Sequence, residues 1–386
     1  MPLMPTSVSR RQLLALGAFA PALLPAAKAA TSYLVYFGTY TRKASKGIYV
    51  SQLDAATGRL TDPELAAETP NPSFVAIHPS RRFLYSVSEA GAPGTKGGSV
   101  TSFAIDPATG KLNKLNTISS KGDGPCHLNV DKTGRTLVLA NYGSGSTTAL
   151  KVNADGSLAE GEGFVQHKGS SVDKRRQMGP HAHSANISFD NKYVVVADLG
   201  LDQVLVYRLD PANASLSPND PPHVSVKPGS GPRHFTFHPK GKFAYVINEM
   251  ASTVTAFRWN ARNGSFTEIE TVSTLPAGDK TDNTTAEVVA HPNGKFLYGS
   301  NRGHNSLAVF AIDSSTGRLK LSGNVPTQGQ IPRNFAIEPG GRWLLAANQN
   351  SDTVVVFGIN PTTGMLTPTG QTLQVGMPVC VRFVAR

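Results

Sequence analysis

The stretch GPRHFTFHPKGKFAYVINEMASTVTAFRW, which starts at Gly231, has a counterpart in IPRNFAIEPGGRWLLAANQNSDTVVVFGI, which starts at Ile331. Between them, Thr285 opens the related stretch TAEVVAHPNGKFLYGSNRGHNSLAVFAI. Each copy contains a predicted strand, a polar turn such as HPKG or EPGG, a β-rich strand, a loop that opens with a polar residue, and a third alternating strand. A repeated unit of several strands is typical of a β-propeller blade.

The same unit extends toward the N-terminus and has a regular spacing. Gly241 and Gly294 are 53 residues apart, and Gly294 and Gly341 are 47 residues apart, close to the ~40–50-residue period of propeller blades. The upstream copies are NPSFVAIHPSRRFLYSVSE from Asn71, GPCHLNVDKTGRTLVLANY from Gly124, which contains the landmark Gly134, and GPHAHSANISFDNKYVVVADLGLDQVLVYRL from Gly179. Six internal copies are therefore legible.

The two ends of the chain supply a seventh copy. The N-terminal segment SYLVYFGTYTRKASKGIYVSQLDAATGRL predicts two or three strands, and the final MPVCVRFVAR matches the opening strand of a repeat. We predict an all-β fold over residues 30–386, a seven-bladed propeller whose N- and C-terminal strands share one blade. The recurring DAATGRL, DPATGKL, DSSTGRL and NPTTGML stretches are predicted hairpins into the outer strand of a blade.

Residues 1–29 are predicted to be an export signal and not part of the fold. Ser9-Arg10-Arg11 is followed by a modest apolar run and by the small-residue region Ala27-Lys28-Ala29, a pattern typical of the twin-arginine route. The run is too short and too interrupted by proline for a membrane span. We expect the twin-arginine export machinery as a partner and a periplasmic or secreted location.

The charge of the chain favours a small anionic ligand. The formal net charge is +11, and removal of residues 1–29 would delete Arg10, Arg11 and Lys28 and no acidic residue, which leaves +8. No basic helix and no alternation of aromatic and basic residues is present, so no nucleic-acid partner is predicted. The charged KGSSVDKRRQMG segment within residues 161–179 is either a solvated loop or a rim of the binding face.

The two cysteines, Cys126 and Cys380, lie near the first strands of blades that should not be adjacent. Their Cα atoms are therefore expected to be too far apart for a disulfide. Two buried free thiols are predicted.

A propeller binds its ligand on one face over the central channel, so functional residues are expected at one fixed point in the repeat. His181 and His183 alternate along a predicted strand, which allows both imidazoles to face one ligand or metal, although no nearby acid or cysteine completes a metal set. Arg233, beside His234, and Arg333 begin inner strands, where a buried guanidinium favours an anion. We predict no metal and no cofactor.

A second group follows the second strand of each blade. Glu249 and Arg302 occupy this position, which varies between blades, as expected for residues that line a shared site, whereas the Asn before it is expected to be structural. Glu287 is a further acid at the level of the inner strand. A carboxylate beside arginines is either a general base or a salt-bridge partner.

Together these motifs resemble the bacterial 6-phosphogluconolactonase family of seven-bladed propellers, which also contains a fungal carboxymuconate lactonizing enzyme. The likeness runs from Tyr33 to Phe383 through PCHLNVD, PHAHSANIS, GPRHFTFHP, INE, SNRGHNS and PRNFAIEP, in that order. The resemblance implies lactone ring opening or closing without a metal. It also implies a catalytic set, which by motif is His183, Arg233, Glu249 and Arg302. His181, His234, Arg333 and Glu287 are then expected to contact substrate.

The predicted function is metal-independent hydrolysis of a sugar-acid lactone by general-base attack of water. Glu249 or His183 would take the proton of water, while Arg233 and Arg302 would stabilise the oxyanion and hold an acidic substituent. No G-x-S-x-G elbow is present, which disfavours an acyl-enzyme. The export signal separates the chain from the cytoplasmic phosphorylated substrate of the family. The alternatives are a non-catalytic propeller that binds a sugar acid, peptide or cell-wall fragment, and a calcium-dependent gluconolactonase of another propeller family.

Overall fold

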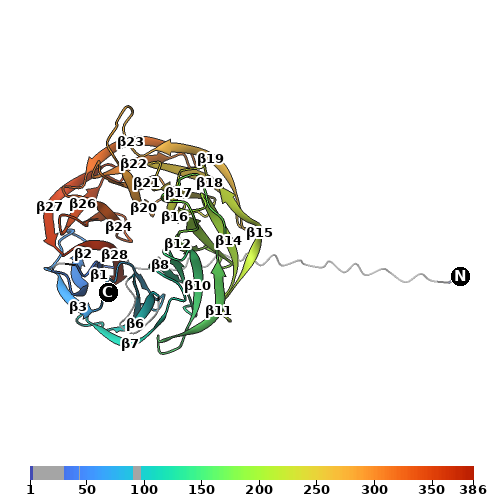
Figure 1. Ribbon diagram of the computed structural model, residues 1–386, viewed down its shortest axis with the longest axis horizontal. Coiled ribbons are helices and arrows are strands. Elements are labelled where there is room, and N and C mark those ends of the chain that lie inside the picture. The colour runs from blue at the N-terminus through green and yellow to red at the C-terminus, as the bar shows by residue number, and fades with distance from the viewer. Residues whose placement is uncertain (3–29, 43, 90–96) are drawn as a thin grey trace.

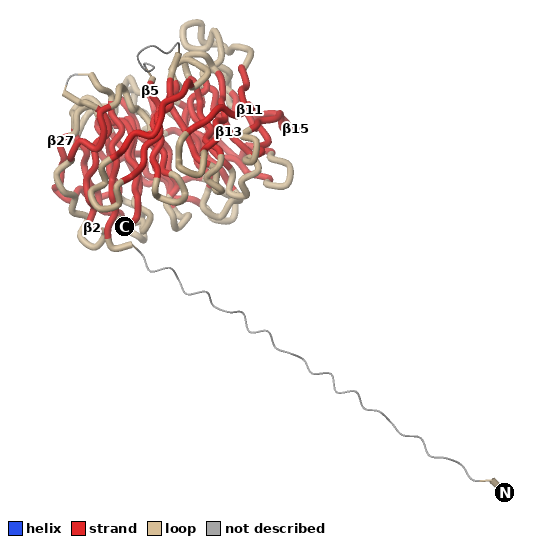
Figure 2. The backbone as a smooth tube through the Cα atoms, turned by 90° about the horizontal axis from the view of Figure 1, so that it is seen from below, coloured by secondary structure: helices blue, strands red, loops and turns tan. Residues whose placement is uncertain are grey.

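The computed structural model describes residues 1–2, 30–42, 44–89 and 97–386. Within these ranges every regular element is a strand, and the strands form seven four-stranded antiparallel sheets around a central channel (Figure 1). Seen from the side, the strands run between the two faces of the ring (Figure 2). The predicted seven-bladed, all-β propeller is confirmed.

Each blade contributes its first strand to the channel wall and its last strand to the outer rim (Figure 1). The first three sheets comprise β28 (Pro378–Ala385), β1 (Ser32–Thr39), β2 (Gly47–Asp54) and β3 (Glu64–Glu68); β4 (Val75–Ile77), β5 (Phe83–Ser88), β6 (Ser99–Ile105) and β7 (Leu112–Ser119); and β8 (Pro125–Val130), β9 (Thr136–Asn141), β10 (Ser146–Val152) and β11 (Leu158–Gln166). The next two comprise β12 (Ala182–Ile187), β13 (Tyr193–Asp198), β14 (Gln203–Asp210) and β15 (Ser215–Ser225); and β16 (Pro232–Phe237), β17 (Phe243–Asn248), β18 (Thr253–Asn260) and β19 (Ser265–Ser273). The last two comprise β20 (Thr284–Ala290), β21 (Phe296–Arg302), β22 (Ser306–Ile312) and β23 (Leu319–Pro326); and β24 (Pro332–Ile337), β25 (Trp343–Asn348), β26 (Thr353–Ile359) and β27 (Leu366–Gln374).

The C-terminal strand closes the ring as predicted. β28 is the innermost strand of the sheet β28-β1-β2-β3 and pairs with β1 from Tyr33↔Ala385 to Thr39↔Pro378. It also contacts the inner strands on both sides, β24 and β4. The two ends of the chain thus form one blade, and no inner strand of the ring lacks a neighbour.

The hydrophobic core lies between the blades. Tyr298 on β21, for example, packs in one buried cluster with Leu344 on β25 of the next blade. Three buried tyrosines of this kind reach the following blade with their hydroxyl groups: Tyr36, Tyr245 and Tyr298 donate hydrogen bonds to the carbonyl oxygens of Gly110, Gly317 and Gly364, at 2.9, 3.2 and 2.8 Å. These glycines belong to the predicted TG hairpins, so a motif that sets a local turn also joins neighbouring blades.

The polar turns between first and second strands make a similar link on one face of the ring. The imidazoles of His238 and His291 bond through Nε2 to the carbonyl oxygens of Gly294 and Gly341 in the next blade, both at 2.8 Å. Both glycines have a positive φ, +70° and +78°, and a Cβ atom on either would clash with the histidine ring of the preceding blade. This contact explains why glycine recurs at the landmark positions.

The Asn that ends the second strand in four blades is structural, as predicted. Asn141, Asn248, Asn301 and Asn348 are buried, and each donates through Nδ2 to a Ser or Thr of the adjacent third strand. In the β12–β15 blade the residue is Asp198, which bonds to His167 Nδ1 at 2.7 Å. His167 in turn bonds to Thr147 Oγ1 at 3.0 Å.

Both cysteines are free and buried, as predicted, and they belong to sheets separated by the β4–β7 blade. The predicted export signal at residues 1–29 lies outside the described residues, apart from its first two. Among the residues that are described, none belongs to a helix capable of crossing a bilayer.

Candidate active site

The predicted site residues converge because the starts of inner strands pair with the ends of second strands. The register places Pro125 opposite Asn141 and Pro232 opposite Asn248, and equivalent pairs recur in the neighbouring blades. Residues just inside the first strand and just after the second therefore gather at one face of the ring. This confirms that the two groups of candidate residues share a face.

A β-bulge at this point in the repeat turns one residue into the channel in four of the inner strands, β8, β12, β16 and β24. The pairing slips by one residue immediately after the strand start, and the extra residue is Cys126 in β8, His183 in β12, Arg233 in β16 and Arg333 in β24. An extra residue in a bulge is released from the ladder, and its side chain is directed away from the regular alternation. The bulges therefore aim a thiol, an imidazole and two guanidinium groups at a common volume.

Glu249 lies at the centre of the site. It follows β17, is 5% exposed, and receives Arg233 Nε at 2.8 Å and Arg302 Nη2 at 3.0 Å on Oε2. Arg176 Nη2 donates to Oε1 at 2.7 Å, and His183 Nε2 lies 3.9 Å from Oε2. The four residues predicted to be catalytic are therefore brought together around one carboxylate.

The arginines determine the protonation state of Glu249. Burial of the carboxyl raises its pKa, but the charges of Arg302 and Arg233 and the hydrogen bond from Arg176 outweigh burial and lower the pKa to about 2. Glu249 is therefore ionised at neutral pH. A carboxylate with so low a pKa is a poor general base and an effective counterion.

Replacement of Glu249 by Gln is expected to lower the free energy of unfolding at pH 7 by roughly 3 kcal/mol, because the ordinary pKa of 4.5 falls to about 2 on folding. A depressed pKa stabilises the fold fully above pH ~4.5, and this stabilisation is lost as pH falls through the folded pKa of about 2. The difference between wild type and variant, measured by denaturant titration, should therefore shrink between pH 4.5 and 2. A difference that is constant over that range would contradict this account of Glu249.

A cavity of about 310 Å³ opens beside Glu249 at this face. It is lined by Arg176, Arg302 and Arg333, by Glu89 and Glu249, and by Cys126, Tyr142, His183 and two glycines. Glu89 accepts hydrogen bonds from Ser73 Oγ at 2.7 Å and Tyr40 Oη at 3.1 Å. With Arg233 beneath, the site holds four arginines and two glutamates and so favours an anion.

Arg302 is a largely buried cation whose hydrogen-bonding capacity is only partly used. Its Nη2 bonds to Glu249 and to the Thr285 carbonyl oxygen at 2.8 Å, but its buried Nε has no hydrogen-bond partner among the described residues. Burial, followed by the charge of Arg233, lowers the pKa of Arg302 to about 9 in spite of Glu249. Nε is itself buried, so Arg302 faces the cavity through the rest of its guanidinium, and the repulsion from Arg233 favours an anion there.

His183 is neutral in this environment. Burial and the charge of Arg233 hold the pKa of the imidazole well below its usual range. The Cys126 Sγ atom lies 3.7 Å from Nδ1, and the ring meets Tyr142 edge-on with centroids 5.1 Å apart. A neutral imidazole has one ring nitrogen available to accept a proton.

Of the four residues expected to contact substrate, His181, His234 and Glu287 lie outside the main cavity. His181 does not face the cavity with His183: its Nδ1 bonds to the Tyr142 carbonyl oxygen at 2.9 Å and its ring stacks on Tyr142 at 4.6 Å. The expectation that both imidazoles of H-x-H face one ligand is wrong, because His181 precedes β12 and the bulge at His183 breaks the alternation. His181 instead supports a wall of the site.

His234 and Glu287 lie deeper in the channel and bond to each other, with His234 Nδ1 2.9 Å from Glu287 Oε1. His234 lines only a small void of about 10 Å³ beneath the main cavity, together with Arg233. Neither residue lines the main cavity. Arg333 does, and its guanidinium carbon lies 5.5 Å from the centre of the Tyr40 ring.

Sequence reasoning missed Arg176, which belongs to the charged segment within residues 161–179. Asp173 Oδ1 accepts from the backbone N–H groups of Arg175 and Arg176, and Gln177 Nε2 donates to the Leu199 carbonyl oxygen at 2.8 Å. These bonds fix the turn so that Arg176 reaches Glu249 and also donates to Tyr142 Oη at 3.1 Å. Of the two alternatives, the rim of the binding face holds for Arg176, while Arg175 is exposed. Arg175 and Arg176 are adjacent in the sequence, and no local pattern distinguishes the one that reaches the site from the one that is exposed.

Over the described ranges, no group of three or more His, Cys, Asp or Glu side chains is arranged to hold a metal ion.

Comparison with known proteins agrees with this geometry. The model of the family described as "Lactonase, 7-bladed beta-propeller" matches residues 34–383. The chain belongs to this lactonase family. A 6-phosphogluconolactonase of Bacillus subtilis is 38% identical over 355 residues, 92% of this chain and 99% of the relative. A second, from Formosa agariphila, is 36% identical over 79% of this chain and 86% of the relative.

Among solved structures, the periplasmic gluconolactonase of Pseudomonas aeruginosa has a similar fold, with a TM-score of 0.86 and 38% identity over 92% of this chain and 99% of that one. Proteins similar to this chain therefore include a periplasmic gluconolactonase as well as 6-phosphogluconolactonases. The resemblance in the sequence to a lactonase family is confirmed.

Proposed function

We propose that this protein hydrolyses the lactone of a sugar acid. The observation that carries the proposal is Arg302: a guanidinium at the cavity wall, beside Arg233 and Glu249, with a buried Nε that lacks a partner in the described chain. A lactone carbonyl develops negative charge on its oxygen when water attacks, and buried donors already in place stabilise that charge. Membership of the lactonase family gives the same reaction class.

In the proposed mechanism a water molecule attacks the carbonyl carbon and His183 accepts its proton. The carbonyl oxygen becomes an oxyanion that Arg302 and Arg233 stabilise. The ring C–O bond then breaks, and the leaving alkoxide takes the proton back from His183, which gives the open hydroxy acid. Glu249 holds the arginines in place and offers a negative charge to the transient imidazolium, whose Nε2 lies 3.9 Å away.

His183 is preferred as the base because the pKa of Glu249 is about 2, far from neutral pH. The profile of kcat/KM against pH tests the assignment. With His183 as the base, activity should fall on the acid side as the imidazole is protonated, at a pH below the ordinary pKa of 6.5. Activity that stays constant down to about pH 3, together with full loss in Glu249→Gln, would assign the base to Glu249.

The direct test measures acid release from purified protein with a panel of lactones: glucono-δ-lactone, its 6-phosphate, and galactono-γ-lactone, each corrected for spontaneous hydrolysis. Acceleration with at least one lactone, retained in EDTA, is the expected result. No acceleration with any would overturn the proposal in favour of a propeller that only binds a sugar acid, peptide or cell-wall fragment. Loss in EDTA and recovery with calcium would favour a calcium-dependent gluconolactonase.

Arg176 is expected to bind an acidic substituent of the substrate. Its side chain is 40% exposed at the rim, whereas Arg233 and Arg302 are more deeply buried. Arg176→Met should lower kcat/KM for a phosphorylated or carboxylated lactone by about 10–100-fold, the value of one charge-assisted hydrogen bond, and leave a neutral lactone within a few-fold. Arg175→Met, the exposed neighbour, is the matched control. An equal loss for charged and neutral lactones would show that Arg176 serves only to hold Glu249.

We further propose that the chain works outside the cytoplasm. Support comes from the twin-arginine pattern at Ser9-Arg10-Arg11 and from the periplasmic relative of similar fold. Cell fractionation of the tagged full chain should recover it outside the cytoplasm, and Arg10→Lys combined with Arg11→Lys should retain it inside. An unchanged distribution in that double variant would rule out the twin-arginine route.

A further inference from the structure

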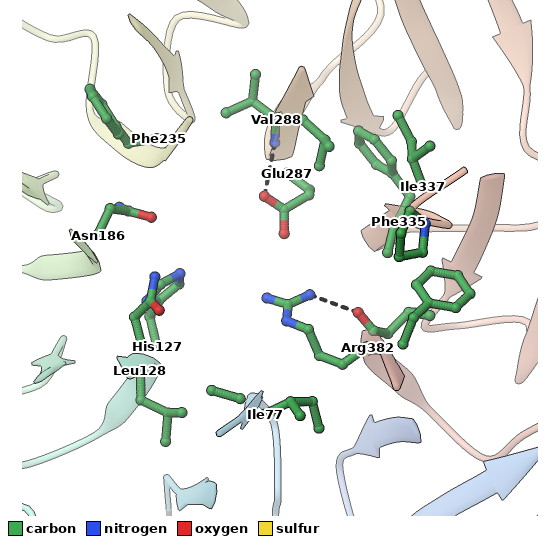
Figure 3. A pocket seen from close by; sticks show the side chains of 17 residues that line it. Ile77, His127, Leu128, Asn186, Phe235, Glu287, Val288, Phe335, Ile337 and Arg382 are labelled. Carbon is green, nitrogen blue, oxygen red and sulfur yellow. Dashed lines mark hydrogen bonds between the residues drawn. The ribbon is translucent and has the colours of Figure 1, made fainter. Parts of the chain in front are cut away.

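The channel contains a second cavity beyond the proposed active site, toward the opposite face. It has a volume of about 450 Å³ and shares no lining residue with the cavity beside Glu249. Its wall is formed by the middle and far ends of the inner strands, including Ile77, Phe335 and Ile337 (Figure 3). A volume of this size is typical of small-molecule sites.

A layer of rings in tilted and edge-to-face contact separates the two cavities. The centroid of the Phe74 ring lies 4.2 Å from that of the His127 ring and 5.8 Å from that of the His234 ring. The centroids of the two histidine rings are 5.3 Å apart. His127 lines the far cavity, whereas His183 lines the active-site cavity. The ring centroids of His183 and His234 are 5.4 Å apart. The far cavity is therefore a compartment of its own rather than the lower end of the active site.

Arg382 gives this compartment its chemistry. Its side chain extends from β28 into the cavity (Figure 3), and its guanidinium carbon lies 4.5 Å from the centre of the Phe74 ring. Its one hydrogen bond within the described chain goes from Nη1 to the Val381 carbonyl oxygen at 2.7 Å, and no described carboxylate makes a salt bridge with it. A guanidinium that is removed from water normally pairs with an anion, and the half-buried Arg382 has unused donors and no direct ion pair with a described residue.

Glu287 is the acidic residue in the cavity wall, and both of its carboxylate oxygens already accept hydrogen bonds from other residues. Glu287 Oε1 is bonded to His234 Nδ1 and, at 3.0 Å, to the Val288 backbone N–H, and Oε2 accepts from Asn334 Nδ2. Glu287 nonetheless faces the same space as Arg382 (Figure 3). Its negative charge repels a phosphate dianion more strongly than an anion of single charge.

Further polar groups of the wall have unused hydrogen-bonding capacity. The Asn129 amide makes no side-chain hydrogen bond with any described residue, and Asn186 uses only Nδ2, in a bond to Ser184 Oγ at 3.2 Å. His127 accepts the Ala185 backbone N–H on Nδ1 at 3.3 Å, and burial lowers its pKa well below the usual range, so the neutral ring carries its proton on Nε2. A few convergent polar groups in a partly apolar cavity are the pattern of a ligand site.

We propose that this far cavity is a second binding site, which takes a small organic monocarboxylate with its carboxylate on Arg382 and its apolar body against Ile77, Phe335 and Ile337. The inference does not depend on the lactonase activity, because it uses none of the residues that line the active-site cavity. A ligand bound there would contact the ring layer that His127 and His234 form beneath Arg233 and His183.

The test combines titration with direct placement of the ligand. Benzoate and butyrate are titrated calorimetrically into the full-length protein, with benzamide and butyramide as neutral isosteres. We expect a carboxylate to bind at least about 10-fold more tightly than its amide, as for one charge-assisted contact. Arg382→Met should abolish the difference and Arg302→Met, in the other cavity, should retain it. Equal binding of acid and amide, or loss in Arg302→Met with retention in Arg382→Met, would overturn the proposal.

A crystal of wild-type protein soaked in 4-bromobenzoate decides the site without any variant, which matters should Arg382→Met fold poorly. The anomalous signal of bromine is expected in the cavity lined by Ile77, Phe335 and Ile337. Bromine found only beside Glu249, or at neither place, would refute the second site, while the lactone assay independently decides the proposed function.

Discussion

Replacement of Arg302 by Met is expected to lower kcat/KM for lactone hydrolysis by about 10²–10³-fold, the usual cost of losing one oxyanion donor. Arg302 lines the active-site cavity, and its Nε is a buried donor without a partner in the described chain. Met keeps much of the apolar stem and removes the charge and all donors. Steady-state kinetics on the best lactone of the panel measure the effect, with the melting temperature as the folding control.

Arg318→Met is the matched control, because the Arg318 side chain is 62% exposed on a hairpin and, within the described part of the chain, bonds to Glu270 alone. It should leave kcat/KM unchanged. Arg302→Lys should recover part of the rate, since an ammonium restores charge but not the planar fork. If Arg302→Met retains activity within a factor of about three of wild type, Arg302 is not an oxyanion donor, and Arg233→Ala, for which a loss of similar size is expected, becomes the decisive variant.

Deletion of residues 377–386 is expected to abolish the folded monomer. The deletion removes β28, which buries Val379, Cys380, Val381 and Val384 and pairs along the length of β1. Burial of side chains of this size contributes about 1.5–3 kcal/mol each, so their loss approaches the roughly 5–15 kcal/mol that stabilises a typical domain. It also opens the ring, since β28 contacts β24 and β4.

Circular dichroism and size-exclusion chromatography of the deletion variant should show loss of cooperative unfolding and aggregation through the exposed edge of β1. Removal of Arg386 alone, which lies beyond the strand and is exposed, is the control and should be tolerated. A β28 peptide added in trans should restore part of the structure. A deletion variant that melts cooperatively at the wild-type temperature would mean that β28 does not close the ring.

The sequence by itself determined the fold and the face on which the site lies. Strand alternation, the TG hairpins and the landmark glycines predicted the blades, and the final strand predicted the closure, because these are local patterns with a fixed relation to backbone geometry. The same repeat placed Arg233 at the start of a first strand and Glu249 and Arg302 at the ends of second strands, and antiparallel pairing of these two strands brings such points to one face.

Only the tertiary structure decided which side chains meet. The bulges that turn His183 and Arg233 into the channel follow from how first and second strands pair, and a simple two-residue alternation wrongly placed His181 with His183. Arg176 reaches Glu249 from a loop 73 residues away in the chain, and His234 pairs with Glu287 from the next blade. Contacts between segments distant in sequence depend on how the whole ring closes, so they determine the pKa of Glu249 and the separation of the two cavities, neither of which any local pattern encodes.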